Sequence, residues 1–403
     1  MRIHTVVLLG TLFILAPIIP AGRQFATGEP PRSQNPGHPL KSSDVITQFQ
    51  WLTVQIAYPP PGPGEDAKLL GPLKQYFEKA GYQIHGDTYP MTWADDDEIY
   101  ASAGDPNWGG KNDGLDIEKF TGTPPHYTIT RVNRMSDYVG YGGSGVKPSG
   151  MICVKGVLYL AFQNLLGDKP PAYGTKSQHG SDATIVSSRD HGKTWTPAFH
   201  DIKGPMFPGS LFGGPAFVNT GRDNADAPDP YVYAVSTEQW DNGSHLRVGR
   251  APADRIQDAG AWEWIAELKD YNHPQWTRNL QQAIPVLTDD RRISLPDMAY
   301  IAAIKRYVLL TWRLYKDYSP DDGTELTIYD APYPWGPFTL VHHEAIWESV
   351  DMNPYCPRLP LKWLHTTSDG LVGWIQFSGS YRRNSMEYRS HVREFKMSVR
   401  KRN

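Results

Sequence analysis

The stretch that decides the fold is residues 188–195, which read SRDHGKTW and fit the spacing Ser-x-Asp-x-Gly-x-x-Trp. In such a segment an aspartate side chain accepts hydrogen bonds from turn amides, and a glycine takes positive φ without a steric penalty. The tryptophan that follows packs beneath the turn. The segment therefore predicts a β-hairpin turn in which Asp190 has a structural role and is not part of an active site.

Residues 188–195 are similar to the Asp-box, a hairpin turn found in sialidase-type and other propellers. Five further segments repeat one theme, a short strand rich in Tyr or Trp that follows a polar turn, at intervals of roughly 60–75 residues. β units at regular intervals are typical of a propeller, whose blades have four strands each. The sequence therefore predicts an all-β, five-bladed β-propeller, and a jelly roll with an accessory β domain is the alternative. The segments are Glu98–Ala103, Gly150–Gln163, Pro230–Thr237, Asp297–Trp312 and Leu371–Ser378, anchored by Tyr100, Tyr159, Tyr233, Tyr307 and Trp374.

The N-terminus predicts export. An apolar run over residues 6–19 follows Arg2 and is too short for a membrane span, which needs about 20 apolar residues. We expect a secreted or periplasmic protein, and a retained N-terminal anchor is the alternative. The expected organisation is a signal peptide over residues 1–22, an extension over residues 23–84 with one helix between Glu65 and Ala80, and the propeller over residues 85–403.

Composition limits the partners. A net charge of −3 over 403 residues gives no reason to expect binding to nucleic acid or to an anionic membrane. We expect a monomer with a carbohydrate substrate. Cys153 and Cys356 are either a disulfide or two buried free thiols. No Cys/His ligand spacing is visible, so we expect no metal and no cofactor; a structural Ca²⁺ ion is compatible with the acidic loops, but no ligand spacing demonstrates it.

An acidic run stands before one of the aromatic strands. Residues 92–105 read TWADDDEIYASAGD. Carboxylates this close repel one another, so they favour solvent, a cation or a shared proton. Because the loops that enter the innermost strands line the central depression of a propeller, we expect Asp96 to meet the substrate, with Asp95 and Asp97 as alternatives. A solvated turn is the competing interpretation.

Two further carboxylates stand next to predicted strands. Asp182 precedes the strand that leads into the Asp-box, and a turn cap is its structural alternative. Glu238 ends an apolar strand and is followed by Trp240. A carboxyl group beside an indole is desolvated, which raises its pKa and suits a general acid. A solvated glutamate at a strand end is the alternative.

Other polar and aromatic residues at loops and strand ends are candidates for substrate binding. Flat aromatic faces stack on the C–H faces of sugar rings, although aromatic side chains also fill blade cores. With Asp95 and Asp97, the candidates are Trp93, His179, Trp240, Asp297, Arg313, Asn353, Tyr355 and Arg358.

Three separated stretches resemble the family known as domain of unknown function 4185. They are residues 87–97 (DTYPMTWADDD), 246–256 (LRVGRAPADRI) and 353–363 (NPYCPRLPLKW). The resemblance covers about residues 85–395 and implies a five-bladed propeller related in shape to glycoside hydrolase family 43. Some relatives are endo-acting D-arabinanases, so the resemblance also implies glycan cleavage.

The roles of family 43 residues follow from the same resemblance. That family inverts configuration with an Asp base in the first blade, a middle Asp that modulates pKa and a Glu acid. By blade order these roles fall on Asp96 (or a neighbouring Asp), Asp182 and Glu238.

Three functions remain open on the sequence alone. The leading one is a glycoside hydrolase that uses a carboxylate acid and a carboxylate base. The second is a polysaccharide lyase, with His179 or Tyr355 as base and Arg358 neutralising a uronate. The third is a non-catalytic propeller that binds sugar.

Overall fold

Almost all regular structure in the described residues is β-strand, broken only by single turns of 3₁₀ helix. This computed structural model describes residues 40–58, 86–108, 111–112, 114–140, 145–166, 180–316, 319–350, 352–379 and 388–400. All of them lie in one unit, Pro39–Asn403. The helix expected between Glu65 and Ala80 and the expected signal peptide fall outside these ranges.

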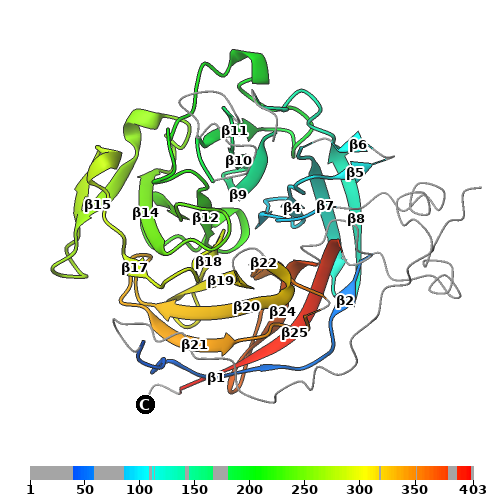
Figure 1. Cartoon of the computed structure of the whole chain (residues 1–403), viewed down its shortest axis with the longest axis vertical. Coiled ribbons are helices and arrows are strands. Elements are labelled where there is room, and N and C mark those ends of the chain that lie inside the picture. The colour runs from blue at the N-terminus through cyan, green and yellow to red at the C-terminus, as the bar shows by residue number, and fades with distance from the viewer. Residues whose placement is uncertain are drawn as a thin grey trace, which may run out of the picture. The chain divides into compact units, whose positions relative to one another are not determined.

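Antiparallel sets of strands follow one another in chain order around a common centre (Figure 1). The first set is a four-stranded sheet, and the second is a three-stranded sheet. The first comprises β3 (Met91–Trp93), β4 (Ile99–Ala101), β7 (Ile117–Thr123) and β8 (His126–Asn133), with the hairpin β5 (Asn107–Trp108) and β6 (Lys111–Asn112) beside it in sequence; the second comprises β9 (Lys147–Val154), β10 (Val157–Gln163) and β11 (Thr184–Ser188).

The next two sets are joined into one ten-stranded sheet by parallel pairing of β12 with β18. One set comprises β12 (Ala216–Asn219), β13 (Tyr231–Ser236), β14 (His245–Pro252), β15 (Glu263–Glu267), β16 (Gln275–Thr277) and β17 (Leu287–Thr288). The other comprises β18 (Asp297–Ile301), β19 (Arg306–Lys316), β20 (Ser319–Ala331) and β21 (Thr339–Glu344). The 3₁₀ turns are η2 (Phe199–Asp201), η3 (Arg222–Asn224), η4 (Ala259–Ala261), η5 (Leu280–Gln282) and η6 (Leu361–Trp363).

The last sheet is completed by the N-terminal part of the chain. It runs in the order β1-β25-β24-β22, with β2 and β23 at its margins. Its strands are β1 (Ile46–Trp51), β2 (Ile56–Ala57), β22 (Tyr355–Arg358), β23 (His365–Thr367), β24 (Gly370–Gly379) and β25 (Arg389–Val399). Because β1 pairs with β25, the strand unit begins before residue 85, where the sequence had placed the boundary of the propeller.

The aromatic repeat reads correctly in the structure. Its anchors lie on the strand that pairs with the innermost strand of each set, namely Tyr100 on β4, Tyr159 on β10, Tyr233 on β13, Tyr307 on β19 and Trp374 on β24. Buried apolar side chains form clusters between neighbouring sheets, which removes their area from water at about 25 cal/mol per Å². Cys153 and Cys356 are two buried free thiols within these clusters, so the disulfide alternative is wrong.

The Asp-box turn forms as the sequence predicts. Asp190 Oδ1 accepts a hydrogen bond from the Thr194 amide at 2.8 Å, and Gly192 has φ +88°. Trp195 is buried and its indole donates to the Gly192 carbonyl at 3.0 Å. Partial burial opposes the effect, but hydrogen bonds from Thr194 and Ser188 lower the pKa of Asp190 to about 2. Asp190 is therefore a structural carboxylate.

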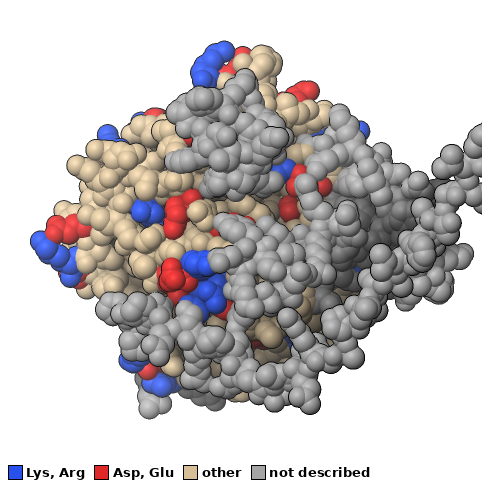
Figure 2. All heavy atoms as spheres, in the orientation of Figure 1, with Lys and Arg blue, Asp and Glu red and all other residues tan. Residues whose placement is uncertain are grey.

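Charges of both signs are interspersed on the described surface. Figure 2 shows Lys and Arg side chains next to Asp and Glu on this face, with no broad field of one sign among the described residues. Within the described ranges, the structure has no helix with the length and apolar character that crossing a bilayer requires.

A buried guanidinium ties the last strand set to its neighbours. Arg358 has no exposed surface, donates from Nε to the Thr88 carbonyl at 2.7 Å and from Nη1 to the Pro296 carbonyl at 2.9 Å. Its Nη1 also lies 3.8 Å from Asp297 Oδ1. One side chain thus links β22 to the segments that precede β3 and β18.

We predict that Arg358→Leu lowers the free energy of unfolding by about 3–5 kcal/mol, because it leaves Asp297 buried without its charge partner. Chemical denaturation followed by tryptophan fluorescence measures the change. The matched control is Arg255→Leu, which removes an exposed pair with Asp258 and is expected to leave stability nearly unchanged. Equal effects of the two substitutions would contradict the linking role of Arg358.

Candidate active site

The innermost strands of all the sets begin at one edge, which we call the polar edge. Ser149 near the start of β9 donates to the carbonyl of Pro215, just before β12, at 2.9 Å. β12 and β18 run parallel, and Trp312, whose carbonyl accepts the amide of Ser294 just before β18, packs on Tyr355 at the start of β22. Tyr355 at the start of β22 reaches the segment before β3. The N-terminal ends of β3, β9, β12, β18 and β22 therefore meet.

Asp87 occupies the polar edge ahead of β3. Its side chain is buried, and its Oδ2 accepts a hydrogen bond from the Tyr355 hydroxyl at 2.9 Å. Within the described part of the chain, its Oδ1 accepts none. Burial and the neighbouring Asp105 carboxylate raise the pKa of Asp87 to about 6, against the opposing effects of Lys147, Tyr355 and Tyr388. A buried carboxyl with this pKa can take up and release a proton near neutral pH.

Asp105 lies beside Asp87 because the two segments pair. An isolated bridge joins Asp87 to Gly104 across the ends of the β3–β4 hairpin. The Asp105 carboxylate forms a buried ion pair with the Lys147 ammonium, which comes from the start of β9. Lys147 thus pairs with Asp105 and acts on Asp87 only through its charge, and we call Asp87, Asp105, Lys147 and Tyr355 the buried carboxylate cluster.

The backbone around this cluster is strained. Thr88 and Tyr89 have φ of +64° and +40°, values that side chains other than Asn and Asp rarely adopt. Asp105 also lies at positive φ. Such strain costs of order 1–3 kcal/mol per residue and concentrates at functional sites. Gly104 supplies the space that the cluster needs, since a Cβ there would overlap Asp87 Oδ1.

Sequence reasoning missed Asp87, Asp105 and Lys147. A usable signal was present, because the dipeptides Gly86-Asp87 and Gly104-Asp105 stand symmetrically on either side of the acidic turn. In an antiparallel hairpin, residues equidistant from the turn become neighbours. The turn residues themselves lie at the other end of the hairpin.

Asp182 and Glu238 do lie at the polar edge, with different hydrogen-bond partners. Asp182 is buried at φ +54°, its Oδ1 accepts from the Gly209 amide at 2.9 Å, and within the described residues its buried Oδ2 accepts no hydrogen bond. Burial favours a higher pKa for Glu238, but hydrogen bonds from the Ser244 amide and His245 outweigh it, and the pKa is lowered. The raised pKa that we expected for a Glu238 general acid is therefore wrong.

Several predicted substrate-binding residues are buried in the framework of this edge. Arg358 binds backbone carbonyls, and Asp297 Oδ2 accepts the Leu359 amide at 2.8 Å. Burial raises the pKa of Asp297. Asn353 is fully buried at φ +43°. Burial also raises the pKa of Tyr355 well above its usual value, which makes its phenol a poor base.

Two other predicted residues belong to the same edge. Trp240 packs on Trp312 and Tyr355, with ring centroids 5.8 and 6.4 Å apart. The Arg313 guanidinium forms an ion pair with the buried Glu325 carboxylate. His179 lies outside the described residues.

The acidic run lies at the opposite edge. Asp95, Asp96 and Asp97 form the turn between β3 and β4, where Asp95 is half-buried and Asp96 and Asp97 are exposed. Asp96 is bonded within this turn, since its Oδ2 accepts from the Tyr100 hydroxyl at 2.8 Å. The structure does not bring Asp96 together with Asp182 and Glu238, because the hairpin places them at opposite ends of the strands.

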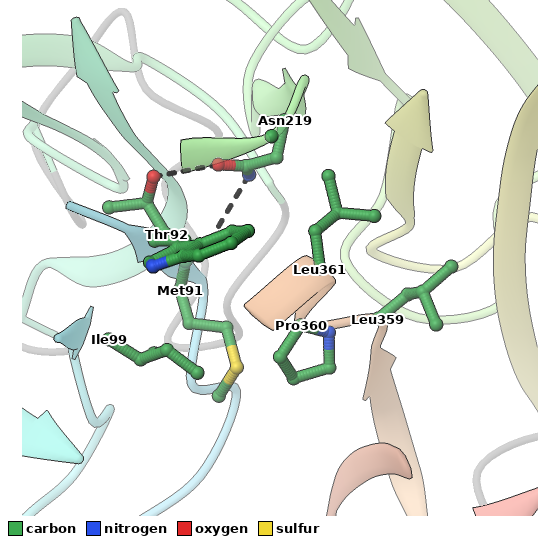
Figure 3. Close-up of a pocket in the computed structure, with 9 residues that line it drawn as sticks. Met91, Thr92, Ile99, Asn219, Leu359, Pro360 and Leu361 are labelled. Carbon is green, nitrogen blue, oxygen red and sulfur yellow. Dashed lines mark hydrogen bonds between the residues drawn. The ribbon is translucent and has the colours of Figure 1, made fainter. Parts of the chain in front are cut away.

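Trp93 also faces away from the polar edge. It lines a small, mainly apolar pocket with Met91 and the segment Leu359–Leu361 (Figure 3). The Thr92 hydroxyl in this pocket donates to Asn219 Oδ1 at 2.7 Å, as the dashed line in the figure marks. The Trp93 indole donates to Asp97 Oδ1 at 2.8 Å. The pocket is therefore separate from the buried carboxylate cluster.

The arrangement suits acid–base chemistry. When the surroundings of two neighbouring carboxyl groups give them different pKa values, one can act as the acid and the other as the base of a reaction. At the polar edge, Asp87 is the group with the raised pKa and Asp105 is the group whose charge Lys147 compensates.

We predict that Asp87→Asn stabilises the fold more at pH 7.5 than at pH 4. The pKa of Asp87 is raised in the folded state, so wild-type stability falls as pH increases from about 4 to about 6, and asparagine removes this loss. Thermal unfolding of both proteins at the two pH values measures the difference. The same difference in Tm at both pH values would contradict the raised pKa.

This chain is similar to several solved structures. No curated protein matches the chain. Solved structures of similar fold include an α-L-arabinofuranosidase from Podospora anserina in complex with cellotriose, at 13% identity and TM-score 0.47, covering 87% of this chain and 98% of that one. A GH43_1 enzyme from Xanthomonas citri complexed with xylotriose has 14% identity and TM-score 0.45, covering 79% and 90%. A xylan β-1,4-xylosidase from Bacillus halodurans has 11% identity and TM-score 0.43, covering 77% and 53%.

The family comparison is more direct. The profile described as "Domain of unknown function (DUF4185)" matches residues 76–344. This match includes Asp87, Asp105 and Lys147 of the buried carboxylate cluster, ends before Tyr355, and confirms the resemblance seen in the sequence. The chain therefore belongs to the DUF4185 family.

Proposed function

We propose that this protein is a glycoside hydrolase whose active site is the polar edge of a five-bladed propeller. The observation that carries the proposal is Asp87, a buried carboxyl with a pKa raised to about 6, placed beside the Asp105–Lys147 ion pair. The five strands β3, β9, β12, β18 and β22 supply one innermost strand for each blade. The family resemblance supports a polysaccharide or oligosaccharide as substrate.

Asp87 and Asp105 divide the chemistry between them. Hydrolysis of a glycosidic bond needs one carboxylic acid to protonate the leaving oxygen and one carboxylate to assist the attack on the sugar. We assign the acid to Asp87, because burial and the Asp105 charge keep its proton at mildly acidic pH. We assign the ionised role to Asp105, because the Lys147 ammonium compensates its negative charge.

Tyr355 and Gly104 position the acid. The Tyr355 hydroxyl donates to Oδ2 of Asp87 and fixes the direction of the carboxyl group. Gly104 lets the carboxyl lie close over the neighbouring strand, where any larger residue would displace it. Asp182, at the same edge with a buried oxygen that accepts no bond from the described residues, supports a charge-modulating role in the second blade.

A lyase fits the geometry less well. Proton abstraction beside a uronate needs a basic residue and a cation that reaches the sugar carboxylate. Tyr355 has a pKa raised well above its usual value, and the Arg358 guanidinium is buried on backbone carbonyls. A hydrolase instead needs one protonated and one ionised carboxyl group, which Asp87 and Asp105 supply.

Export supports a role on an extracellular glycan. We propose that residues 1–22 are a signal peptide, on the basis of the short apolar run behind Arg2. A single copy of the chain contains all members of the buried carboxylate cluster, so we propose that the monomer is active.

We predict that Asp87→Asn and Asp105→Asn each lower kcat by about 10²–10⁴-fold, the usual contribution of a general acid or base. The assay incubates each protein with plant, algal and bacterial-wall glycans and measures new reducing ends. The matched control is Asp97→Asn, at the opposite edge of the same hairpin, which is expected to keep wild-type activity.

Each rival function has its own outcome in this assay. An unsaturated product that absorbs in the ultraviolet would identify a lyase. Glycan binding by the wild type, unchanged in all three variants and without turnover on any glycan, would identify a sugar-binding propeller. Activity lost in Asp97→Asn and kept in Asp87→Asn would move the active site to the other edge.

A further inference from the structure

Two strand sets place three metal-ligating side chains together at the edge opposite the polar edge. Asp95 and Asp96 come from the β3–β4 turn, and His191 comes from the Asp-box turn after β11. One ligand atom from each lies within 4.8 Å of the others. About a third of the His191 and Asp95 side chains is exposed, 34% and 38%, so an ion can reach them from solvent.

The distance between the His191 nitrogen and an Asp95 oxygen suits two ligands that share one ion. His191 Nε2 lies 2.9 Å from Asp95 Oδ1. Zn²⁺ binds His nitrogen at about 2.0–2.1 Å and carboxylate oxygen at about 2.0–2.2 Å, so neighbouring ligand atoms around it are roughly 3 Å apart.

Tyr100 orients two of the three ligands. Its ring stacks on the His191 imidazole with centroids 5.5 Å apart and planes 16° apart. Its hydroxyl donates to Asp96 Oδ2 at 2.8 Å. Outer partners of this kind fix the direction of metal ligands and raise metal affinity. One tyrosine therefore holds the imidazole of one turn and the carboxylate of the other in place.

The local charge favours a cation. Asp223 adds a third carboxylate, with its Oδ1 and Asp95 Oδ1 lying 3.2 and 3.9 Å from the same buried thiol, Cys153 Sγ. The nearby Arg222 guanidinium donates to the backbone carbonyl of Asp95. Among the described residues, no Lys or Arg side chain forms an ion pair with Asp96.

We propose that Asp95, Asp96 and His191 bind one divalent transition-metal ion of the Zn²⁺ class, which joins the β3–β4 turn to the Asp-box turn. One imidazole and two carboxylates form a nitrogen and oxygen donor set that suits Zn²⁺, with water completing the coordination. Sequence reasoning expected no metal because the ligands come from turns far apart in the chain. The ion is structural and lies away from the buried carboxylate cluster.

The test is a Zn²⁺ titration of the full-length protein after treatment with a chelator. Isothermal titration calorimetry is expected to show one site per chain, and saturating Zn²⁺ is expected to raise Tm. Asp96→Asn and His191→Asn are expected to weaken this site by about 10-fold or more and to abolish the rise in Tm. Asparagine is chosen at position 191 because it tolerates the φ of +55° found there.

Controls separate this site from other sources of binding. Asp97→Asn, in the same turn but bonded to Trp93, is expected to keep wild-type Zn²⁺ affinity. Visible absorption of bound Co²⁺, compared between the wild type and His191→Asn, provides a second readout of coordination by the imidazole. Absence of a stoichiometric site, or an affinity unchanged in both ligand variants, would overturn the proposal. Glycan turnover is expected to survive the chelator, so failure here leaves the proposed function intact.

Discussion

The structure depends on two neighbouring buried carboxyl groups, of which only one has an ion pair with a lysine. Asp87 and Asp105 lie side by side at the ends of one hairpin, and the Lys147 ammonium pairs with Asp105. Burying a second negative charge is costly, so Asp87 binds a proton more readily and its pKa rises to about 6. The same imbalance that costs stability gives the site a titratable group near neutral pH.

The rest of the fold holds this imbalance in place. Arg358 links β22 to the segments before β3 and β18. This link keeps the Tyr355 hydroxyl, on the same strand, within hydrogen-bond distance of Asp87. Strand β1 pairs with β25 and completes the last sheet, which also contains β22. Strained φ values at Thr88, next to Asp87, and at Asp105 persist only because these surroundings over-determine them. The sheets thus stabilise the fold, whereas the strained residues at the polar edge lower its stability.

The sequence predicts the architecture better than the site. The Asp-box turn was predictable because it forms through hydrogen bonds between residues close together in the chain. The strand beside each innermost strand was predictable from the repeated aromatic residues. The outermost strand of the last sheet was not, because β1 pairs with a partner at the other end of the chain. The sequence pointed to Asp96 because it lies in a run of acidic residues. The β3–β4 hairpin, however, places this turn at the end of the strands opposite the polar edge. Asp87 and Asp105 needed the pairing register, and Lys147 needed the packing of β9 beside β3.

A crystal structure of the Asp105→Asn variant with a bound oligosaccharide tests the central claim most directly. The account predicts that a glycosidic oxygen lies within hydrogen-bond distance of the Asp87 carboxyl group. A sugar bound instead at the Trp93 pocket, with the Asp87 carboxyl inaccessible to it, would contradict the account.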